Sequence, residues 1–189
     1  MHLWRSSPWG IYPVCDAELH ASLLPNHSPI LRETWTPPPQ DWIKVNCDVR
    51  VSLESMCIAI VARNYLGKVI WIHSARLDFS DALCGEAAAC CLAVSSAAEL
   101  GYKYVIVESD SRLVINALNK KMSHWALDNY VSFCIKSSPS FSSCNFSNVS
   151  KNCNFVAHNV AKWAFTHQLY GSILLSSVPK ELLCNDREV

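Results

Sequence analysis

A change of hydrophobic period within residues 102–119 most strongly constrains how this chain can fold. Residues 104–107 are apolar and mostly β-branched, which is typical of a buried strand. After residue 110 the apolar positions follow the spacing of one helix face: Leu113, Val114, Ala117 and Leu118. Glu108 and Asp110 lie at the change, so a strand ends in acid and a helix begins on it. Asp110 therefore caps the helix, takes part in chemistry at the sheet edge, or does both.

Alternating strand and helix periods continue along the chain from residue 41. The predicted elements are strands at 41–51, 56–64 and 69–77, a helix at 81–101, a strand at 103–108, helices at about 110–120 and 124–138, a strand at 140–150 and a helix at 152–168. Short turns make the first three strands antiparallel. Asp81 is the expected N-cap of the first helix, and Gly101 lies just past its end. This order predicts an α/β domain with a mixed sheet and helices on its faces.

Proline content separates the N-terminal region from this pattern. Seven of the nine prolines lie in the first 39 residues. Because proline removes a backbone donor and fixes φ, this region is unsuited to sheets and long helices. We therefore predict a Pro-rich disordered tail at 1–34, the folded domain at 35–168 and a C-terminal extension at 169–189.

Composition restricts the classes of protein and partner. Half of the residues are apolar and the net charge is zero, so the chain has no general attraction to nucleic acid or to a membrane surface. The ten cysteines form no Cys-x-x-Cys pair, which indicates a reducing, intracellular protein without disulfides. No signal peptide and no apolar run of about 18 residues is found, so no membrane partner is expected. We expect a monomer, in either the nucleus or the cytoplasm.

Three carboxylates stand in apolar surroundings. Glu86 is the only charged residue between 82 and 98, and Asp48 lies on the strand face opposite Val45 and Cys47. Taken singly, each has an ordinary explanation: a helix dipole for Glu86, solvent for Asp48 and a helix cap for Asp110. Taken together, they can gather at one sheet edge, where clustered carboxylates repel unless a divalent cation neutralises them. Two such cations about 4 Å apart can cleave a phosphodiester.

Four motifs in order resemble one family: "KVNCD" (44–48), "GEAAA" (85–89), "VESDS" (107–111) and "NFVAHNVAKWA" (154–164). They are similar to type 1 ribonuclease H, in its plant, retroelement-related, reverse-transcriptase-like branch. The preceding "TWTPPPQDWIKVN" resembles the usual lead-in of that branch. The resemblance implies a ribonuclease H-like fold with a five-stranded mixed sheet, order 3-2-1-4-5. It also implies metal-dependent hydrolysis of the RNA strand of RNA–DNA hybrids.

The resemblance assigns roles to particular positions. It makes Asp48, Glu86 and Asp110 catalytic carboxylates that bind Mg²⁺ or Mn²⁺. The family places a fourth carboxylate four residues after an asparagine; Asn154 matches that asparagine, and His158 stands in the acid's place. His158 is then either a metal or water contact or a hydrogen-bonded histidine on the inner helix face. Imidazole suits softer divalent metals than Mg²⁺.

Two further departures predict attenuated catalysis. Val49 and Arg50 replace the small pair that follows the family's first acid, and the loop at 147–152 lacks the family's histidine. The candidate substrate contacts are Asn46, Arg50, Asn116, Lys120, Lys121 and Trp125. The lysines also suit a solvated helix end, and Trp125 also suits a core. Two alternatives stay open: a non-catalytic nucleic-acid-binding remnant, and a protein-interaction module that uses the sheet and the N-terminal tail.

Overall fold

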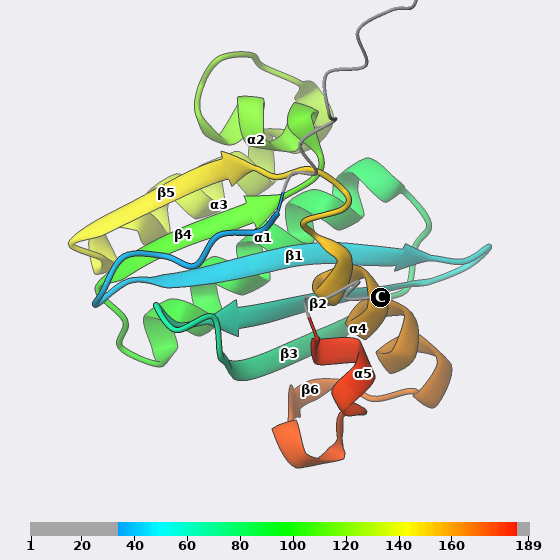
Figure 1. The fold of residues 1–189 in the computed structure, drawn as a ribbon. Helices are drawn as coiled ribbons and strands as arrows, with labels where there is room; N and C mark the ends of the chain where they lie inside the picture. The colour runs from blue at the N-terminus through cyan, green and yellow to red at the C-terminus, as the bar shows by residue number, and fades with distance from the viewer. Residues whose placement is uncertain (1–33, 185–189) are drawn as a thin grey trace, which may run out of the picture. The chain divides into compact units, whose positions relative to one another are not determined.

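The computed structural model describes residues 34–184, and the prediction of a disordered tail lies almost entirely outside them. The described chain forms one six-stranded mixed sheet in the order β5-β4-β1-β2-β3-β6, with helices on both faces (Figure 1). Its elements are β1 (Ile43–Val51), β2 (Met56–Arg63), β3 (Val69–Leu77), α1 (Ala82–Glu99), β4 (Tyr104–Ser109), α2 (Arg112–Leu118), η1 (Trp125–Leu127), α3 (Asp128–Ser137), η2 (Ser138–Ser140), β5 (Ser143–Asn148), α4 (Phe155–His167), β6 (Gly171–Ile173), η3 (Leu175–Ser177) and α5 (Lys180–Leu183).

Strand pairing confirms the predicted 3-2-1-4-5 order. β1, β2 and β3 pair antiparallel, while β4 pairs parallel with β1 and β5 pairs parallel with β4. The prediction lacked the sixth strand. β6 is three residues long and adds to the free edge of β3, so its own sequence carries too little alternation to reveal it.

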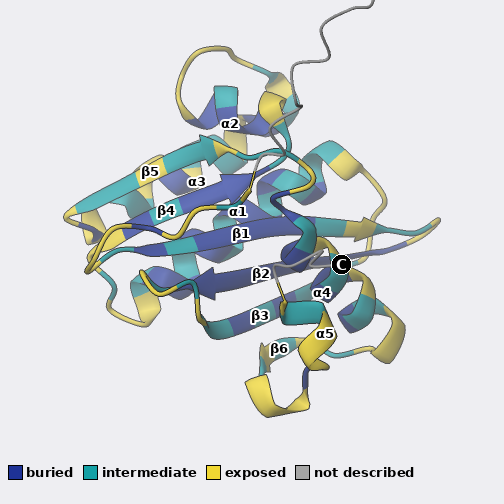
Figure 2. Cartoon of the chain, viewed as in Figure 1, coloured by how far each residue is buried: buried dark blue, intermediate teal, exposed yellow. Residues whose placement is uncertain are grey.

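The sheet is covered on both faces, and β2 shows this best. Every residue of β2 is buried (Figure 2). Its Ile58 and Ile60 join the core cluster beneath α1, while Ala59 and Val61 join a second cluster beneath α4. Since strand side chains alternate between faces, a strand with no exposed residue must lie between two layers.

α1 is the core helix, and small side chains let it lie close to the sheet. Asp81 caps its first turn by accepting from the Cys84 amide at 2.9 Å, and Gly101 follows its end with φ +78, both as predicted. Its length and apolar composition would also suit a membrane span. In this fold, however, α1 packs between the sheet and α3.

The junction of β4 and α2 excludes one of the roles expected for Asp110, that of the helix cap. The strand ends at Ser109, the helix begins at Arg112, and Ser111 is the N-cap residue. Asp110 therefore lies one position before the cap and is not the cap itself. Its carboxylate is left available at the sheet edge.

Candidate active site

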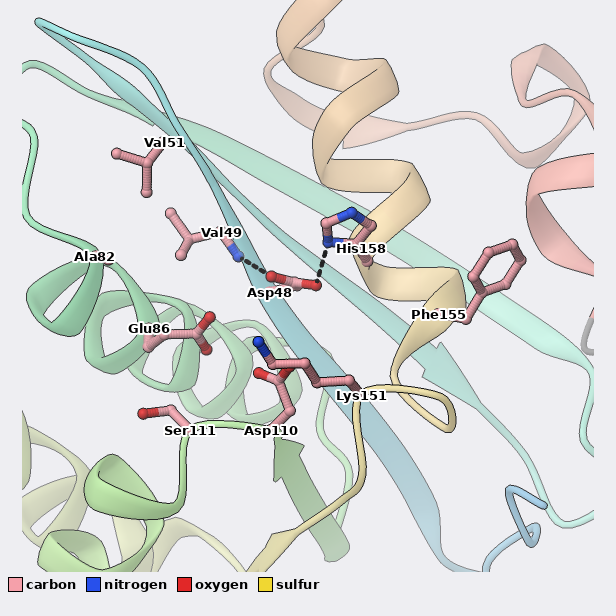
Figure 3. Close-up of a pocket in the computed structure, with 10 residues that line it drawn as sticks. All are labelled: Asp48, Val49, Val51, Ala82, Glu86, Asp110, Ser111, Lys151, Phe155 and His158. Atoms are coloured by element: carbon pink, nitrogen blue, oxygen red, sulfur yellow. Dashed lines mark hydrogen bonds and ion pairs between the residues drawn. The ribbon is translucent and has the colours of Figure 1, made fainter. Parts of the chain in front are cut away.

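The candidate site is a pocket at the carboxyl ends of two parallel strands. The pairing of β1 with β4 ends at Cys47 and Ser109, and Asp48 and Asp110 follow directly. A cavity of about 550 Å³ opens there. It is lined by Asp48, Val49, Val51, Ala82, Glu86, Asp110, Ser111, Lys151, Phe155 and His158 (Figure 3). The structure thus brings all four predicted site residues, Asp48, Glu86, Asp110 and His158, to one pocket.

Asp48 projects from the α4 face of β1 and is 6% exposed. Its Oδ1 accepts from the Val49 amide at 2.6 Å, and its Oδ2 lies 3.1 Å from His158 Nδ1. Burial raises the pKa of Asp48 to about 6, although the Val49 amide and His158 both oppose the rise. The neighbouring Asp110 carboxylate adds to the increase of this pKa.

Glu86 reaches the same pocket from the opposite layer, because it lies on α1. Its Oε2 accepts from Ser109 Oγ at 2.8 Å. Burial raises the pKa of Glu86 to about 8, and repulsion from Asp48 and Asp110 adds to it. Ionisation of two of the three carboxyl groups therefore costs free energy in the absence of a cation.

His158 stands on the first turns of α4 with its side chain 59% exposed. Among the described residues, Asp48 is the carboxylate that its ring contacts. The family's expected acid is thus replaced by a side chain that pairs with the first acid. Such a pair reduces the negative charge of the pocket whenever the imidazole is protonated.

Lys151 is a pocket residue that the sequence analysis missed. It lies in the turn between β5 and α4, and its ammonium group points toward Glu86 and Asp110 (Figure 3). Its charge lowers the pKa of Glu86, against the larger effects that raise it. The signal in the sequence is a single lysine in the loop between the fifth strand and the last helix.

The donor chemistry of the pocket fits a hard divalent cation. Asp48, Glu86 and Asp110 supply carboxylate oxygens, and the raised pKa values of the first two show that the protein does not compensate their charge when they ionise. Within the described residues, however, no three acid, histidine or cysteine groups lie close enough to form a ready ligand cluster.

None of the predicted substrate contacts lines the pocket. Arg50 is exposed on β1. Asn116, on α2, is half-buried, while Lys120 and Lys121 are exposed after that helix. Trp125 is 85% exposed and stacks on His124, so it is not a core residue.

Asn46 lies in the interior, which argues against the expected substrate contact. It has no exposed surface, and its amide is bonded to Glu108, Arg63 and Asn154. These partners lie far apart in sequence, and the alternation of the first strand showed only which face Asn46 occupies. Asn46 therefore belongs to the support of the site.

Comparisons with known proteins agree on the fold. The profile of a family described as reverse transcriptase-like matches residues 46–164. The structure resembles RNase H1 from Halobacterium salinarum NRC-1 (TM-score 0.63, 16% identity, covering 67% of this chain and 98% of that one). It also resembles the RNase H domain of Rv2228c from Mycobacterium tuberculosis (TM-score 0.60, 17% identity, 67% and 94% covered). No curated protein sequence matches the chain.

A third similar structure was solved with a nucleic acid bound. LC11-RNase H1, solved in complex with an RNA/DNA hybrid, matches with a TM-score of 0.58 and 16% identity, covering 68% of this chain and 98% of that one. Identities this low establish the fold alone. The α/β, RNase H-like architecture predicted from the sequence is therefore confirmed.

Proposed function

Because the chain belongs to the reverse transcriptase-like family, we propose that it hydrolyses the RNA strand of RNA–DNA hybrids in a reaction that depends on Mg²⁺ or Mn²⁺. The observation that carries this proposal is the convergence of Asp48, Glu86 and Asp110, from three separate elements, on one pocket. Two of these acids have raised pKa values, as expected of carboxylates that lack a counter-ion. The proposed substrate is the nucleic acid with which LC11-RNase H1 was solved.

In this proposal the three carboxylates hold the divalent cations. When bound, such cations generate a water nucleophile and stabilise the leaving oxygen of a phosphodiester. The Val49 amide orients one oxygen of Asp48, and Ser109 Oγ orients one oxygen of Glu86. Lys151 supplies a positive charge that can face a substrate phosphate in a pocket otherwise dominated by acids. Arg50, Lys120, Lys121 and Trp125 remain candidates for contacts with the rest of the hybrid.

Attenuated activity is part of the proposal, since His158 occupies the place of the fourth carboxylate. An imidazole adds no negative charge there, and it engages Asp48 Oδ2 at 3.1 Å. A cation that uses this oxygen must compete with that contact. We therefore propose that Mn²⁺, which tolerates nitrogen ligands better than Mg²⁺, supports the higher activity.

The first prediction tests the proposed function through Asp110. Asp110→Asn keeps the shape of the side chain and removes its charge, so hybrid cleavage should fall to background while the fold remains. The cleavage of a labelled RNA–DNA hybrid is measured with each metal, alongside circular dichroism. Asp128→Asn, an exposed acid at the start of α3, is the matched control and should cut like the parent. A parent that cuts and an Asp110→Asn variant that cuts equally well would refute the metal-site assignment.

A second candidate function is hybrid binding without cleavage, in a retroelement remnant. The specific observation in its favour is that no three ligand groups within residues 34–184 already cluster. A parent that binds hybrids but cleaves none with either metal would support this alternative. The interaction-module alternative depends on the N-terminal tail, which lies outside the described residues; loss of partner capture on removing 1–34, with hybrid binding intact, would support it.

A further inference from the structure

A buried polar network lies beneath the pocket on the α4 face of the sheet. At its centre Asn46, on β1, donates from Nδ2 to Glu108 Oε2 at 3.0 Å and to Asn154 Oδ1 at 3.3 Å. Its Oδ1 accepts from an Arg63 terminal nitrogen at 2.9 Å. These four side chains are each 5% exposed or less. A single side-chain amide thus connects β1, β2, β4 and the residue that precedes α4.

Trp35, from the segment before the first strand, closes the outer side of this network. Its Nε1 donates to Glu108 Oε2 at 2.9 Å, and the Arg63 guanidinium lies 3.5 Å from the centroid of its ring. Lys44 pairs with the other Glu108 oxygen at 2.8 Å and also donates to the carbonyl of Thr36, next to Trp35. The indole therefore bonds to the acid and stacks on one of its two cations.

The network ends next to the backbone of three pocket residues. Asn154 Nδ2 donates to the carbonyl of Cys47, the residue before Asp48, at 2.8 Å. The carbonyl of Asn154 accepts from the amide of His158 at 3.1 Å, which starts α4. Glu108 lies on β4 two positions before Asp110. The side chains of this network therefore lie next to the backbone from which Asp48, Asp110 and His158 project.

A buried charged network is a poor choice if stability alone is required. Burial lowers the pKa of Arg63 to about 10, which shows that keeping its charge in the interior costs free energy. Apolar side chains of similar volume often stabilise a core as well or better. A polar network does fix the relative placement of the elements it joins, because each bond has a required direction.

We propose that Trp35, Asn46, Glu108 and Asn154 are positioning residues that aim Asp48, Asp110 and His158 at the same pocket. The functional domain then begins at Trp35, ahead of residue 46 where the family match starts. The prediction for the rate of hybrid cleavage rests on the proposed function. The prediction for amide hydrogen exchange does not depend on it.

The test uses two variants and a matched control in the 189-residue chain. Trp35→Phe keeps a ring over Arg63 and removes only the donor to Glu108, and Asn154→Ala removes the donor to the Cys47 carbonyl. Trp42→Phe is the control, since Trp42 lies in the same lead-in and pairs with Tyr104 at 5.4 Å instead of joining the network. Urea unfolding confirms that each variant is folded under the assay conditions.

Positioning predicts a specific pattern of change. The kcat for hybrid cleavage should fall by about tenfold in both variants with KM little changed, as for other residues that orient ligand side chains. Amide hydrogen exchange at Val49 and His158, followed by NMR, should accelerate in both variants. The Trp42→Phe control should match the parent in kcat and in exchange at these two amides.

The outcomes separate this inference from the proposed function. An active parent whose variants keep their kcat overturns the positioning role, whatever happens to exchange. If the parent cleaves no hybrid, the proposed function fails, and exchange alone decides: acceleration at Val49 and His158 supports the network, and unchanged exchange overturns it. Equal acceleration in Trp42→Phe also overturns it, because the effect would then be general loosening.

Discussion

At the scale of single residues, His158 distinguishes this pocket most clearly from one built of four acids. His158→Asp restores a carboxylate and removes the ring that engages Asp48 Oδ2. Activity in Mg²⁺ should rise by roughly tenfold and the preference for Mn²⁺ should shrink, because the pocket gains an oxygen ligand. Cleavage rate is measured against the concentration of each metal.

The control for His158→Asp adds the same charge close by. Asn159→Asp places a carboxylate on the next residue of α4, which does not line the pocket. It should leave the metal preference unchanged. A His158→Asp protein that gains nothing in Mg²⁺ would show that another departure limits catalysis, with Val49 and Arg50 the first to examine.

Lys151 contributes a positive charge to a pocket whose other charged side chains are mostly acidic. Lys151→Met removes a cation that faces Glu86 and Asp110, so a divalent ion should bind roughly three to ten times more tightly. The KM for the hybrid should rise, because a phosphate contact is lost. Isothermal titration with Mn²⁺ and steady-state kinetics measure the two effects.

Lys162→Met is the control for Lys151, since Lys162 is an exposed lysine on α4 outside the pocket. It should change neither the affinity for Mn²⁺ nor the KM. Unchanged or weaker Mn²⁺ binding by Lys151→Met would show that this ammonium group does not compete with the cation.

At the scale of elements, hydrophobic period predicted most of the structure. Each predicted strand and helix is present, and the short turns correctly made β1, β2 and β3 antiparallel. Period depends on which face of an element is buried, so it does not resolve where an end lies. The period therefore does not decide whether Asp110 caps the helix, and in the structure Ser111 holds that position.

The sequence predicts those parts of the site that follow from the order of the strands and helices. Asp48 and Asp110 directly follow the paired stretch of the parallel strands β1 and β4, so their convergence follows from the topology. Asn46 and Asn154 are bonded across 108 positions of sequence, and nothing local to either residue indicates the other. Lys151 reaches the pocket through the path of a loop, which has no period to read.

The contact between α1 and β1 gives a prediction at this scale. A Cβ at Gly85 would lie 2.8 Å from Val49 Cγ2 and 3.1 Å from Met56 Sδ. Gly85→Ala should therefore push α1 from the sheet and destabilise the protein by about 1 to 3 kcal/mol, in spite of alanine's better helix propensity. Urea unfolding measures the loss. Because the displaced turn carries Glu86, affinity for Mn²⁺ should also fall.

A second substitution tests the cause of the Gly85→Ala effect. Val49→Ala removes the methyl group that the new Cβ would meet, so the double variant should recover much of the lost stability relative to Val49→Ala alone. Strict additivity of the two changes in the free energy of unfolding would mean that this contact is not the source. Stability equal to the parent in Gly85→Ala itself would contradict the predicted displacement.

At the scale of the whole molecule, the pocket makes stability depend on pH and on divalent ions. Folding raises the pKa of Glu86 from 4.5 to about 8 and that of Asp48 from 3.8 to about 6. Between each pair of values the folded state binds more protons than the unfolded state. The free energy of unfolding without divalent ions should therefore fall as pH rises through these windows. The fall due to Glu86 should be on the order of 1 to 3 kcal/mol, allowing for its partial exposure.

Glu86→Gln isolates that contribution. The variant should lose the decline in the upper part of the Glu86 window and keep the decline due to Asp48 at lower pH. Excess Mg²⁺ should flatten the profile of the parent, because a bound cation takes the proton's place, and should stabilise the variant less. Urea unfolding across the window, with Mg²⁺ or a chelator, measures both effects. Glu54→Gln, an exposed acid in the turn between β1 and β2, should follow the parent. If the free energy of unfolding of the parent and of Glu86→Gln changed with pH in the same way, Glu86 would not be the group with the raised pKa. Equal stabilisation of both proteins by Mg²⁺ would exclude Glu86 as a ligand of the cation.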